Sequence, residues 1–142
     1  MADKTFVLDT SALLAFVQNE PGAGRVDQIL KSGRKRESNL YVSFVSLAEL
    51  YYVTSREIGR SAALELIAYV KLLPVTVIES AERLTLQAGS IKASSRLSLA
   101  DAFIAATAAQ VEGVLVHKDP EFEKIGNLVT LEKLPYKTPV RR

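Results

Sequence analysis

The segment Thr5-Phe6-Val7-Leu8-Asp9-Thr10-Ser11-Ala12-Leu13-Leu14-Ala15-Phe16-Val17 decides how the rest of the chain is interpreted. Its first four residues are apolar or β-branched, which is typical of a buried strand, and this run ends at Asp9. From Ser11 to Val17 the apolar residues instead follow a helical pattern. A strand, a tight turn that carries an acid, and a helix in direct succession are typical of an α/β domain.

The same alternation continues along the chain. It predicts strands at residues 40–45, 75–78, 114–116 and 128–131, and helices at 26–33, 46–59, 61–73, 81–92, 99–111 and, briefly, 120–124. Such alternation favours a parallel sheet covered on both faces, because every parallel connection needs a helix to cross back. We therefore predict an α/β fold of three layers, α/β/α, around a short, mostly parallel sheet of four to five strands.

Serines precede three of the predicted helices. Ser46 with Glu49, and Ser98 with Asp101, have the spacing of a capping box, in which serine and acid each bind a free backbone N–H group. Ser80 is predicted to cap the helix that begins at residue 81. These positions predict where the helices begin.

Length and composition predict one ordinary domain. The chain has 142 residues, of which 48% are hydrophobic and 24% charged, as in soluble globular domains. We expect a single domain over residues 1–142, with a core at about 6–131 and a basic tail at 132–142. Asp3 places an acid where a signal peptide carries only basic charge, and no apolar run approaches the roughly 20 residues of a membrane span. A cytoplasmic protein with no membrane partner is predicted.

Several kinds of chemistry are excluded by the residue counts. With no cysteine and one histidine, the chain has no disulfide, no thiolate zinc site, no cysteine nucleophile and no site built from several histidines. The motifs G-x-S-x-G, G-x-G-x-x-G and G-x-x-x-x-G-K-[ST] are also missing. Any metal site must therefore rest largely on oxygen ligands.

Four acids lie where the carboxyl ends of the strands are expected to meet. Asp9 ends the first strand, Asp119 follows the strand at 114–116, and Glu49 and Asp101 lie in first helical turns. Ligands of open parallel sheets bind beyond this edge. Each acid also has a purely structural explanation, as a helix cap or part of a capping box, and that explanation is favoured for Glu49 or Asp101 taken alone.

Taken together, the four acids favour a metal site. Carboxylates 4 Å apart repel each other by up to about 4 kcal/mol per pair at an effective dielectric constant near 20. Protonation or a divalent cation would relieve this repulsion, and hard oxygen ligands favour Mg²⁺ or Mn²⁺. Such an ion keeps bound waters and stabilises charge on a phosphate, so the pattern predicts hydrolysis of a phosphodiester.

The chain resembles the PIN-domain nucleases, most closely the VapC-type toxins of type II toxin–antitoxin systems. The resemblance rests on VLDTSALL at 7–14, SLAEL at 46–50, LSLADAFIAATA at 97–108 and VLVHKDPEF at 114–122. It implies a PIN-like fold and a metal-dependent endoribonuclease that hydrolyses phosphodiester bonds of RNA with Mg²⁺ or Mn²⁺. By the same resemblance, Asp9, Glu49 and Asp101 are catalytic, metal-binding acids, and Asp119 is a fourth, more variable one.

Five further residues are assigned to the substrate or to the support of the acids: Thr10, Ser11, Arg96, His117 and Lys118. Ser11 matches the small hydroxyl residue that follows the first acid of the family, although capping of the helix explains it equally well. His117 stands where family members often have Thr or Ser. It contacts a substrate phosphate or fills the space of a hydroxyl, and we do not count it as a metal ligand.

The resemblance also implies partners, namely RNA, a second copy of the chain, and a small VapB-like antitoxin whose C-terminal segment packs beside the active site. Tyr51, Tyr52 and Tyr69 form either an exposed aromatic patch or part of the core, at even odds. The net charge is only +2. The candidates for contact with RNA phosphates are Arg34, Lys35, Arg36, Arg96, Lys118, Lys137, Arg141 and Arg142.

Three alternative functions stay open. The chain is also compatible with a PIN-like RNA-processing nuclease outside a toxin–antitoxin system, and with a non-catalytic PIN-like module that binds RNA or protein. A phosphoryl-transfer enzyme of the haloacid dehalogenase type is disfavoured, because such enzymes use an Asp-x-Asp pair and Ser11 occupies the second position here.

Overall fold

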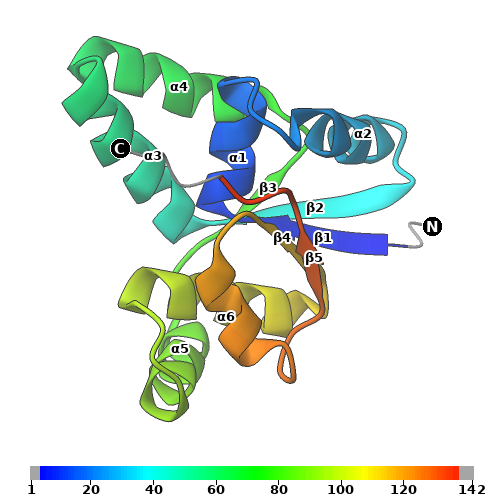
Figure 1. Cartoon of the computed structure of the whole chain (residues 1–142), viewed down its shortest axis with the longest axis vertical. Helices are drawn as coiled ribbons and strands as arrows, with labels where there is room; N and C mark the ends of the chain where they lie inside the picture. The colour runs from blue at the N-terminus through cyan, green and yellow to red at the C-terminus, as the bar shows by residue number, and fades with distance from the viewer. Residues whose placement is uncertain (1–3, 138–142) are drawn as a thin grey trace.

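A single five-stranded sheet lies between two layers of helices (Figure 1). The computed structural model describes residues 4–137. All neighbouring strands are parallel, in the order β3-β2-β1-β4-β5. The predicted three-layer α/β/α fold with a parallel sheet is confirmed. The elements are β1 (Lys4–Leu8), α1 (Thr10–Val17), α2 (Ala23–Arg34), β2 (Ser38–Ser43), α3 (Phe44–Glu57), α4 (Arg60–Leu72), β3 (Thr76–Ile78), α5 (Glu82–Ser94), α6 (Leu99–Val111), β4 (Val114–His117), the 3₁₀ helix η1 (Pro120–Ile125) and β5 (Leu131–Lys133).

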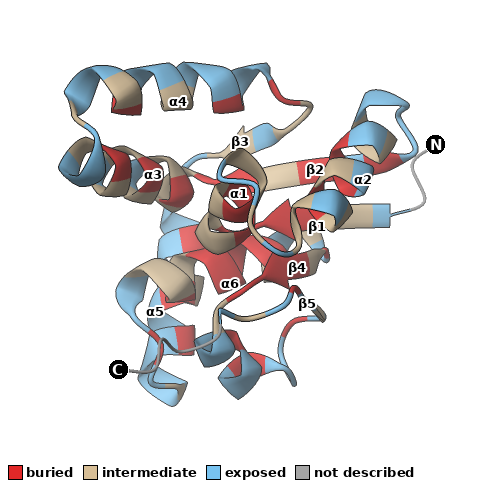
Figure 2. Ribbon diagram, turned by 45° about the horizontal axis from the view of Figure 1, so that its top comes forward, coloured by how far each residue is buried: buried red, intermediate tan, exposed pale blue. Residues whose placement is uncertain are grey.

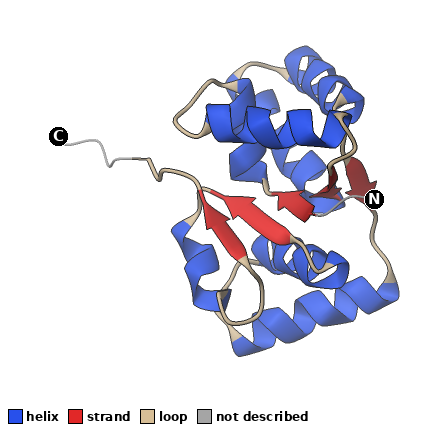
Figure 3. Ribbon diagram, turned by 90° about the vertical axis from the view of Figure 1, so that its right-hand side faces the viewer, coloured by secondary structure: helices blue, strands red, loops and turns tan. Residues whose placement is uncertain are grey.

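The first strand lies at the centre of the sheet, between β2 and β4. The chain first moves outward from β1 to β2 and β3, and then returns to place β4 on the other side of β1. The two sets of connecting helices therefore cover opposite faces of the sheet, as Figure 3 shows. Strand order reverses between β1 and β4, and an open α/β sheet binds its ligands at the carboxyl ends of strands at such a point.

Alternate residues of β1 face two separate hydrophobic cores. Phe6 and Leu8 pack with residues of α1, α2 and α4, whereas Val7 packs with α5, α6 and η1. On α6, the small side chains of Ala102, Ala105 and Ala106 are fully buried, which lets this helix lie close to the sheet (Figure 2). The strand ends are thus fixed from both faces, and this rigidity positions the residues that follow them.

The helix α3 begins earlier than its sequence predicts. Strand β2 ends at Ser43, and the hydroxyl of Ser43 accepts a hydrogen bond from the Val45 N–H group at 3.2 Å. Ser43 is therefore the N-cap, and the prediction of a capping box formed by Ser46 and Glu49 is wrong. Both residues lie within the helix, and neither side chain caps it.

Other boundaries also differ. Ala81, not Ser80, is the N-cap of α5, and no side chain caps this helix. The last strand pairs Leu115 with Leu131, so it covers Leu131–Lys133 in place of 128–131, and the core continues to the buried Leu134. Within residues 4–137, none of the helices has the length and apolar character needed to span a bilayer. The predictions for Asp3, Arg141 and Arg142 fall outside the described residues.

Candidate active site

A cavity of about 220 Å³ lies at the carboxyl edge of the sheet and brings the four predicted acids together. Asp9 comes from the end of β1, Glu49 from α3, Asp101 from the start of α6, and Asp119 from the loop after β4. Its lining contains no basic side chain. The complete lining is Asp9, Thr10, Ser11, Leu14, Glu49, Val53, Asp101, Ile104 and Asp119.

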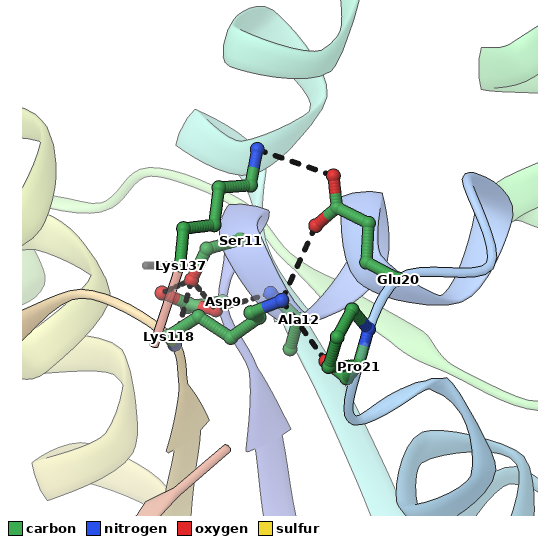
Figure 4. A network of polar contacts seen from close by, with 7 residues as sticks. All are labelled: Asp9, Ser11, Ala12, Glu20, Pro21, Lys118 and Lys137. Carbon is green, nitrogen blue, oxygen red and sulfur yellow. Dashed lines mark hydrogen bonds and ion pairs between the residues drawn. The ribbon is translucent and has the colours of Figure 1, made fainter. Parts of the chain in front are cut away.

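Asp9 is almost completely buried and is held by hydrogen bonds from α1. Its side chain caps this helix, because Oδ1 accepts from the Ala12 N–H group at 2.7 Å. The Ser11 hydroxyl lies 2.8 and 2.7 Å from the two carboxylate oxygens and accepts from the Lys118 N–H group at 2.9 Å (Figure 4). Ser11 thus joins the ends of β1 and β4 and hydrogen-bonds within the site, as predicted, while the cap of the helix is Asp9.

Glu49 is held by a residue next to Asp9. The Thr10 hydroxyl donates to Glu49 Oε1 at 2.6 Å and lies 3.0 Å from the hydroxyl of the buried Ser46. Since Glu49 does not cap its helix, its contact with Thr10 across the cavity is what fixes its position. The capping-box explanation that competed with a site role for Glu49 therefore does not apply.

Asp101 and Asp119 are neighbours whose backbones are fixed by caps. Ser98 caps α6 and accepts from the Asp101 N–H group at 3.1 Å, so the prediction for Ser98 is confirmed. Asp119 caps η1 by accepting from the Glu121 N–H group at 2.9 Å. The Asp101 and Asp119 side chains both line the cavity, and the charge of Asp119 raises the pKa of Asp101. Asp119 therefore combines a cap role with a place in the cavity, whereas Asp101 takes part in the cap of α6 only through its backbone N–H group.

The electrostatics of the cavity disfavour negative charge. Burial, together with the charges of Asp101 and Asp119, raises the pKa of Asp9 to about 7, although hydrogen bonds from Ser11 and Ala12 oppose this rise. Burial and the charges of Asp119 and Glu49 likewise raise the pKa of Asp101 to about 7. A cavity that resists ionisation of its own acids attracts protons or cations.

In a chelating buffer, the free energy of unfolding is expected to fall as the pH rises from about 4 to about 7, and to level off above pH 7. In this window the folded state keeps protons on Asp9 and Asp101 that the unfolded state, with a pKa near 3.8, has lost. Asp9, which is 2% exposed, contributes at most about 4 kcal/mol, at about 1.4 kcal/mol per pKa unit. Urea unfolding at several pH values measures the slope. A stability that increased between pH 5 and 7 would contradict this electrostatic description.

Replacement of Ser11 by alanine is expected to raise the pKa of Asp9 further. The variant loses the hydrogen bond that stabilises the ionised carboxylate, and it leaves the Lys118 N–H group without its acceptor. A buried donor without a partner costs about 1–3 kcal/mol of stability. Carbon-13 NMR titration of the Asp9 carboxyl measures the pKa, and Ser11→Thr, which keeps the hydroxyl, is the control. An unchanged Asp9 titration in Ser11→Ala would show that this hydrogen bond has no effect on ionisation.

The ligand atoms of the cavity fit a hard divalent cation. The polar side-chain atoms that line the cavity are carboxylate and hydroxyl oxygens. Mg²⁺ and Mn²⁺ prefer such oxygen ligands. Among residues 4–137, no three acidic or histidine side chains are already arranged so that they could hold a metal ion. Asp9 and Glu49 instead face the hydroxyls of Ser11 and Thr10. Binding of a metal therefore requires the carboxylates to rotate.

Several predicted residues lie outside this cavity. The Lys118 side chain is only 3% exposed, and its ammonium group contacts Glu20 Oε1 at 3.3 Å and donates to the Pro21 carbonyl at 2.9 Å (Figure 4). The expected contact of this ammonium with substrate at the acids is not supported, and only the Lys118 N–H group takes part in the site. Arg96 is exposed in the loop between α5 and α6. The basic residues 34–36 precede β2 and thus lie at the opposite edge of the sheet.

His117 is fully buried and binds the backbone of Asp119. Its Nδ1 atom accepts from the Asp119 N–H group at 3.2 Å, and its ring packs edge-on against Phe122 with centroids 5.3 Å apart. Within residues 4–137, Nε2 has no hydrogen-bond partner. Burial lowers the pKa of His117 and keeps the imidazole neutral. The structure therefore favours a space-filling and positioning role over contact with phosphate.

Sequence reasoning missed the apolar walls of the cavity and the acid that binds Lys118. Leu14, Val53 and Ile104 line the cavity together with the acids. Leu14 lies one helical turn after Thr10 and Ser11, so the spacing on α1 could have identified it. No local pattern connects Glu20 with Lys118, which are 98 residues apart.

The fold and the cavity together define a doubly wound α/β domain with an acidic, oxygen-lined site at the point where its strand order reverses. The model of the PIN domain family matches residues 6–128. The chain therefore belongs to the PIN domain family, and the predicted resemblance to this family is confirmed.

Solved structures of toxin–antitoxin proteins share this fold. VapBC2 from Rickettsia felis, bound to a DNA fragment of its promoter, is 19% identical with a TM-score of 0.72, covering 92% of this chain and 99% of the other. DNA-bound VapBC from Salmonella typhimurium is 21% identical with a TM-score of 0.72, covering 92% and 98%. VapC20 from Mycobacterium tuberculosis, described as a sarcin-ricin loop cleaving toxin, is 20% identical with a TM-score of 0.68, covering 92% and 99%. None of the curated proteins matches the chain in sequence.

Proposed function

We propose that this chain is a metal-dependent endoribonuclease that hydrolyses phosphodiester bonds of RNA and acts as the toxin of a VapBC-type pair. The observation that carries the proposal is the convergence of Asp9, Glu49, Asp101 and Asp119 on one cavity of about 220 Å³ at the switch point of the sheet. The likeness in fold to VapC20, whose description names cleavage of the sarcin-ricin loop, supports RNA as the substrate.

The four carboxylates would hold Mg²⁺ or Mn²⁺. A bound divalent cation activates a water and neutralises charge that develops on the phosphate. The other residues prepare this site: Thr10 and Ser11 orient the carboxylates of Glu49 and Asp9, and His117 fixes the backbone of Asp119. The apolar side chains Leu14, Val53 and Ile104 limit the water around the acids. We expect the protein to work in the cytoplasm, where such RNA is found.

A small VapB-like antitoxin and a second copy of the chain are the proposed partners. The solved neighbours from R. felis and S. typhimurium are described as VapBC complexes, which supports the antitoxin. The helices α3 and α4 expose large apolar side chains, a feature typical of protein interfaces. Tyr52 and Tyr69 are each 44% exposed, which agrees with an exposed position for these two rings and not with a place in the core. Tyr51 is half-buried. Ile58 at the end of α3, and Leu64 and Leu72 on α4, are also exposed.

The metal requirement tests the proposed activity. Purified protein is incubated with a structured RNA that contains single-stranded loops, in a chelating buffer and then with Mg²⁺ or Mn²⁺ added. We expect internal cleavage only with the metal, and a higher melting temperature at pH 8 on metal addition, because the cation neutralises Asp9 and Asp101. Binding of RNA without cleavage under all these conditions would instead support the non-catalytic module.

A further inference from the structure

We propose that a second cavity, directly beside the acids, binds a nucleobase of the RNA strand. This cavity of about 360 Å³ has a mixed lining of apolar, aromatic and charged side chains, namely Ser11, Leu14, Glu20, Lys118, Asp119, Pro120, Tyr136 and Lys137. Its size is within the range of about 300–1,000 Å³ that is typical of sites for small organic groups. The inference rests on the proposed function, since it takes the acid cavity as the position of the scissile phosphate.

The two cavities adjoin each other, because Ser11, Leu14 and Asp119 line both of them. In the proposed arrangement, a strand whose phosphate lies at the carboxylates places an adjoining nucleoside at the second cavity. The occupant is then part of the same molecule that the acids bind, which favours a base of the RNA over an unrelated small molecule.

The aromatic wall of the second cavity is held in a fixed position. The Tyr136 hydroxyl donates to Glu123 Oε2 at 2.9 Å. Burial and this hydrogen bond raise the pKa of Tyr136 to about 12, so the hydroxyl remains a donor. The Tyr136 ring centroid lies 6.1 Å from that of His117 and 5.2 Å from the Lys133 ammonium. Fixed aromatic side chains are the usual platforms on which proteins stack unpaired bases.

Two charged residues of the lining, Glu20 and Lys137, supply an acceptor and a donor. Glu20 accepts from the Lys118 ammonium and pairs with Lys137 at 3.2 Å (Figure 4). Although burial opposes it, these two lysines lower the pKa of Glu20, which therefore stays ionised. The lining combines these charged groups with the apolar Leu14, Pro120 and the Tyr136 ring, a mixture that matches a nucleobase, which has apolar faces and hydrogen-bonding groups along its edge. A peptide, in contrast, would place its backbone amide groups against Leu14 and Pro120 without partners.

The test compares ligands with and without a base. Binding of the four nucleoside 5′-monophosphates and of ribose 5-phosphate is measured with Mg²⁺ present, for the unsubstituted protein and for Tyr136→Leu. At least one nucleotide is expected to bind about tenfold more tightly than ribose 5-phosphate, a difference typical of one stacked base. Tyr136→Leu is expected to remove this difference. Tyr136→Phe, which keeps the ring, is expected to keep it.

A second measurement does not depend on any variant. In the unsubstituted protein, nuclear Overhauser effects are expected between the ring protons of Tyr136 and the protons of the bound base. Equal affinity for ribose 5-phosphate and for every nucleotide, or a bound base without contact to Tyr136, would overturn the inference, as would binding of a peptide in place of nucleotides. Failure of RNA cleavage would reject the proposed function alone, because the ligand comparison needs no catalysis.

Discussion

Asp101→Asn is expected to lower cleavage of RNA about 10³-fold or more while the protein stays folded. The substitution removes one of the four carboxylates, yet asparagine has the same shape, and the backbone N–H group of residue 101 still donates to Ser98. The ionised carboxylate is also disfavoured in the cavity, since burial and the charges of Asp119 and Glu49 raise its pKa to about 7. At pH 8 in a chelating buffer, the variant is therefore expected to melt at the same temperature as the unsubstituted protein or higher.

The matched control for this substitution is Asp27→Asn. Asp27 lies on α2, where it pairs with Lys31 at 3.0 Å on the surface, and such exposed pairs contribute only about 0.3–0.5 kcal/mol. Its cleavage rate is expected to stay within about twofold of the unsubstituted protein. Full activity of Asp101→Asn, with the control unchanged, would show that cleavage does not need this carboxylate.

Glu20→Ala is expected to have the largest effect on stability, with a loss of about 3–5 kcal/mol. The Lys118 ammonium, whose side chain is 3% exposed, would keep only the Pro21 carbonyl as a described partner. A buried charge without its counter-ion is strongly destabilising. For a chain of 142 residues the loss corresponds to a decrease in melting temperature of about 10–17 °C. Chemical and thermal unfolding at pH 7 measure it.

Two further variants distinguish the effect of burying the Lys118 charge from the effect of losing an ion pair. Glu132→Ala removes the same kind of pair, because Glu132 binds Arg25 at 2.7 and 2.9 Å, but these side chains are 29% and 40% exposed. Its expected cost is only about 1 kcal/mol. Adding Lys118→Met to Glu20→Ala removes the buried charge and is expected to recover much of the loss. Equal costs for Glu20→Ala and Glu132→Ala would contradict the role assigned to burial.

The fold and the four acids could be predicted because their signals are local. The change from a strand pattern to a helix pattern at Asp9 is visible within a dozen residues, and it recurs along the chain. Parallel topology then requires Asp9 and Asp119, which follow strands, to lie at one edge of the sheet. The structure places both in one cavity.

Two features of the site could not be predicted from the sequence, because they are decided by competition between neighbouring residues or by contacts between distant ones. Ser43 and Ser46 are equally good caps by residue type, and the register of β2 against β1 and β3 decides that the strand ends at Ser43. The direction of the Lys118 side chain depends on Glu20, which no spacing connects to it. A lysine beside a catalytic motif therefore predicted a contact with phosphate, whereas the folded chain uses it in a buried ion pair.

The sharing of one divalent cation by the four acids is tested most directly by a crystal structure of the protein grown with Mn²⁺. Anomalous scattering is expected to show Mn²⁺ in the cavity of Asp9, Glu49, Asp101 and Asp119, in direct contact with carboxylate oxygens of Asp9 and Asp101. Glu49 and Asp119 are expected to contact the ion directly or through a bound water. Mn²⁺ bound elsewhere at saturating concentration, with this cavity free of anomalous signal, would contradict a metal-dependent nuclease built on these residues.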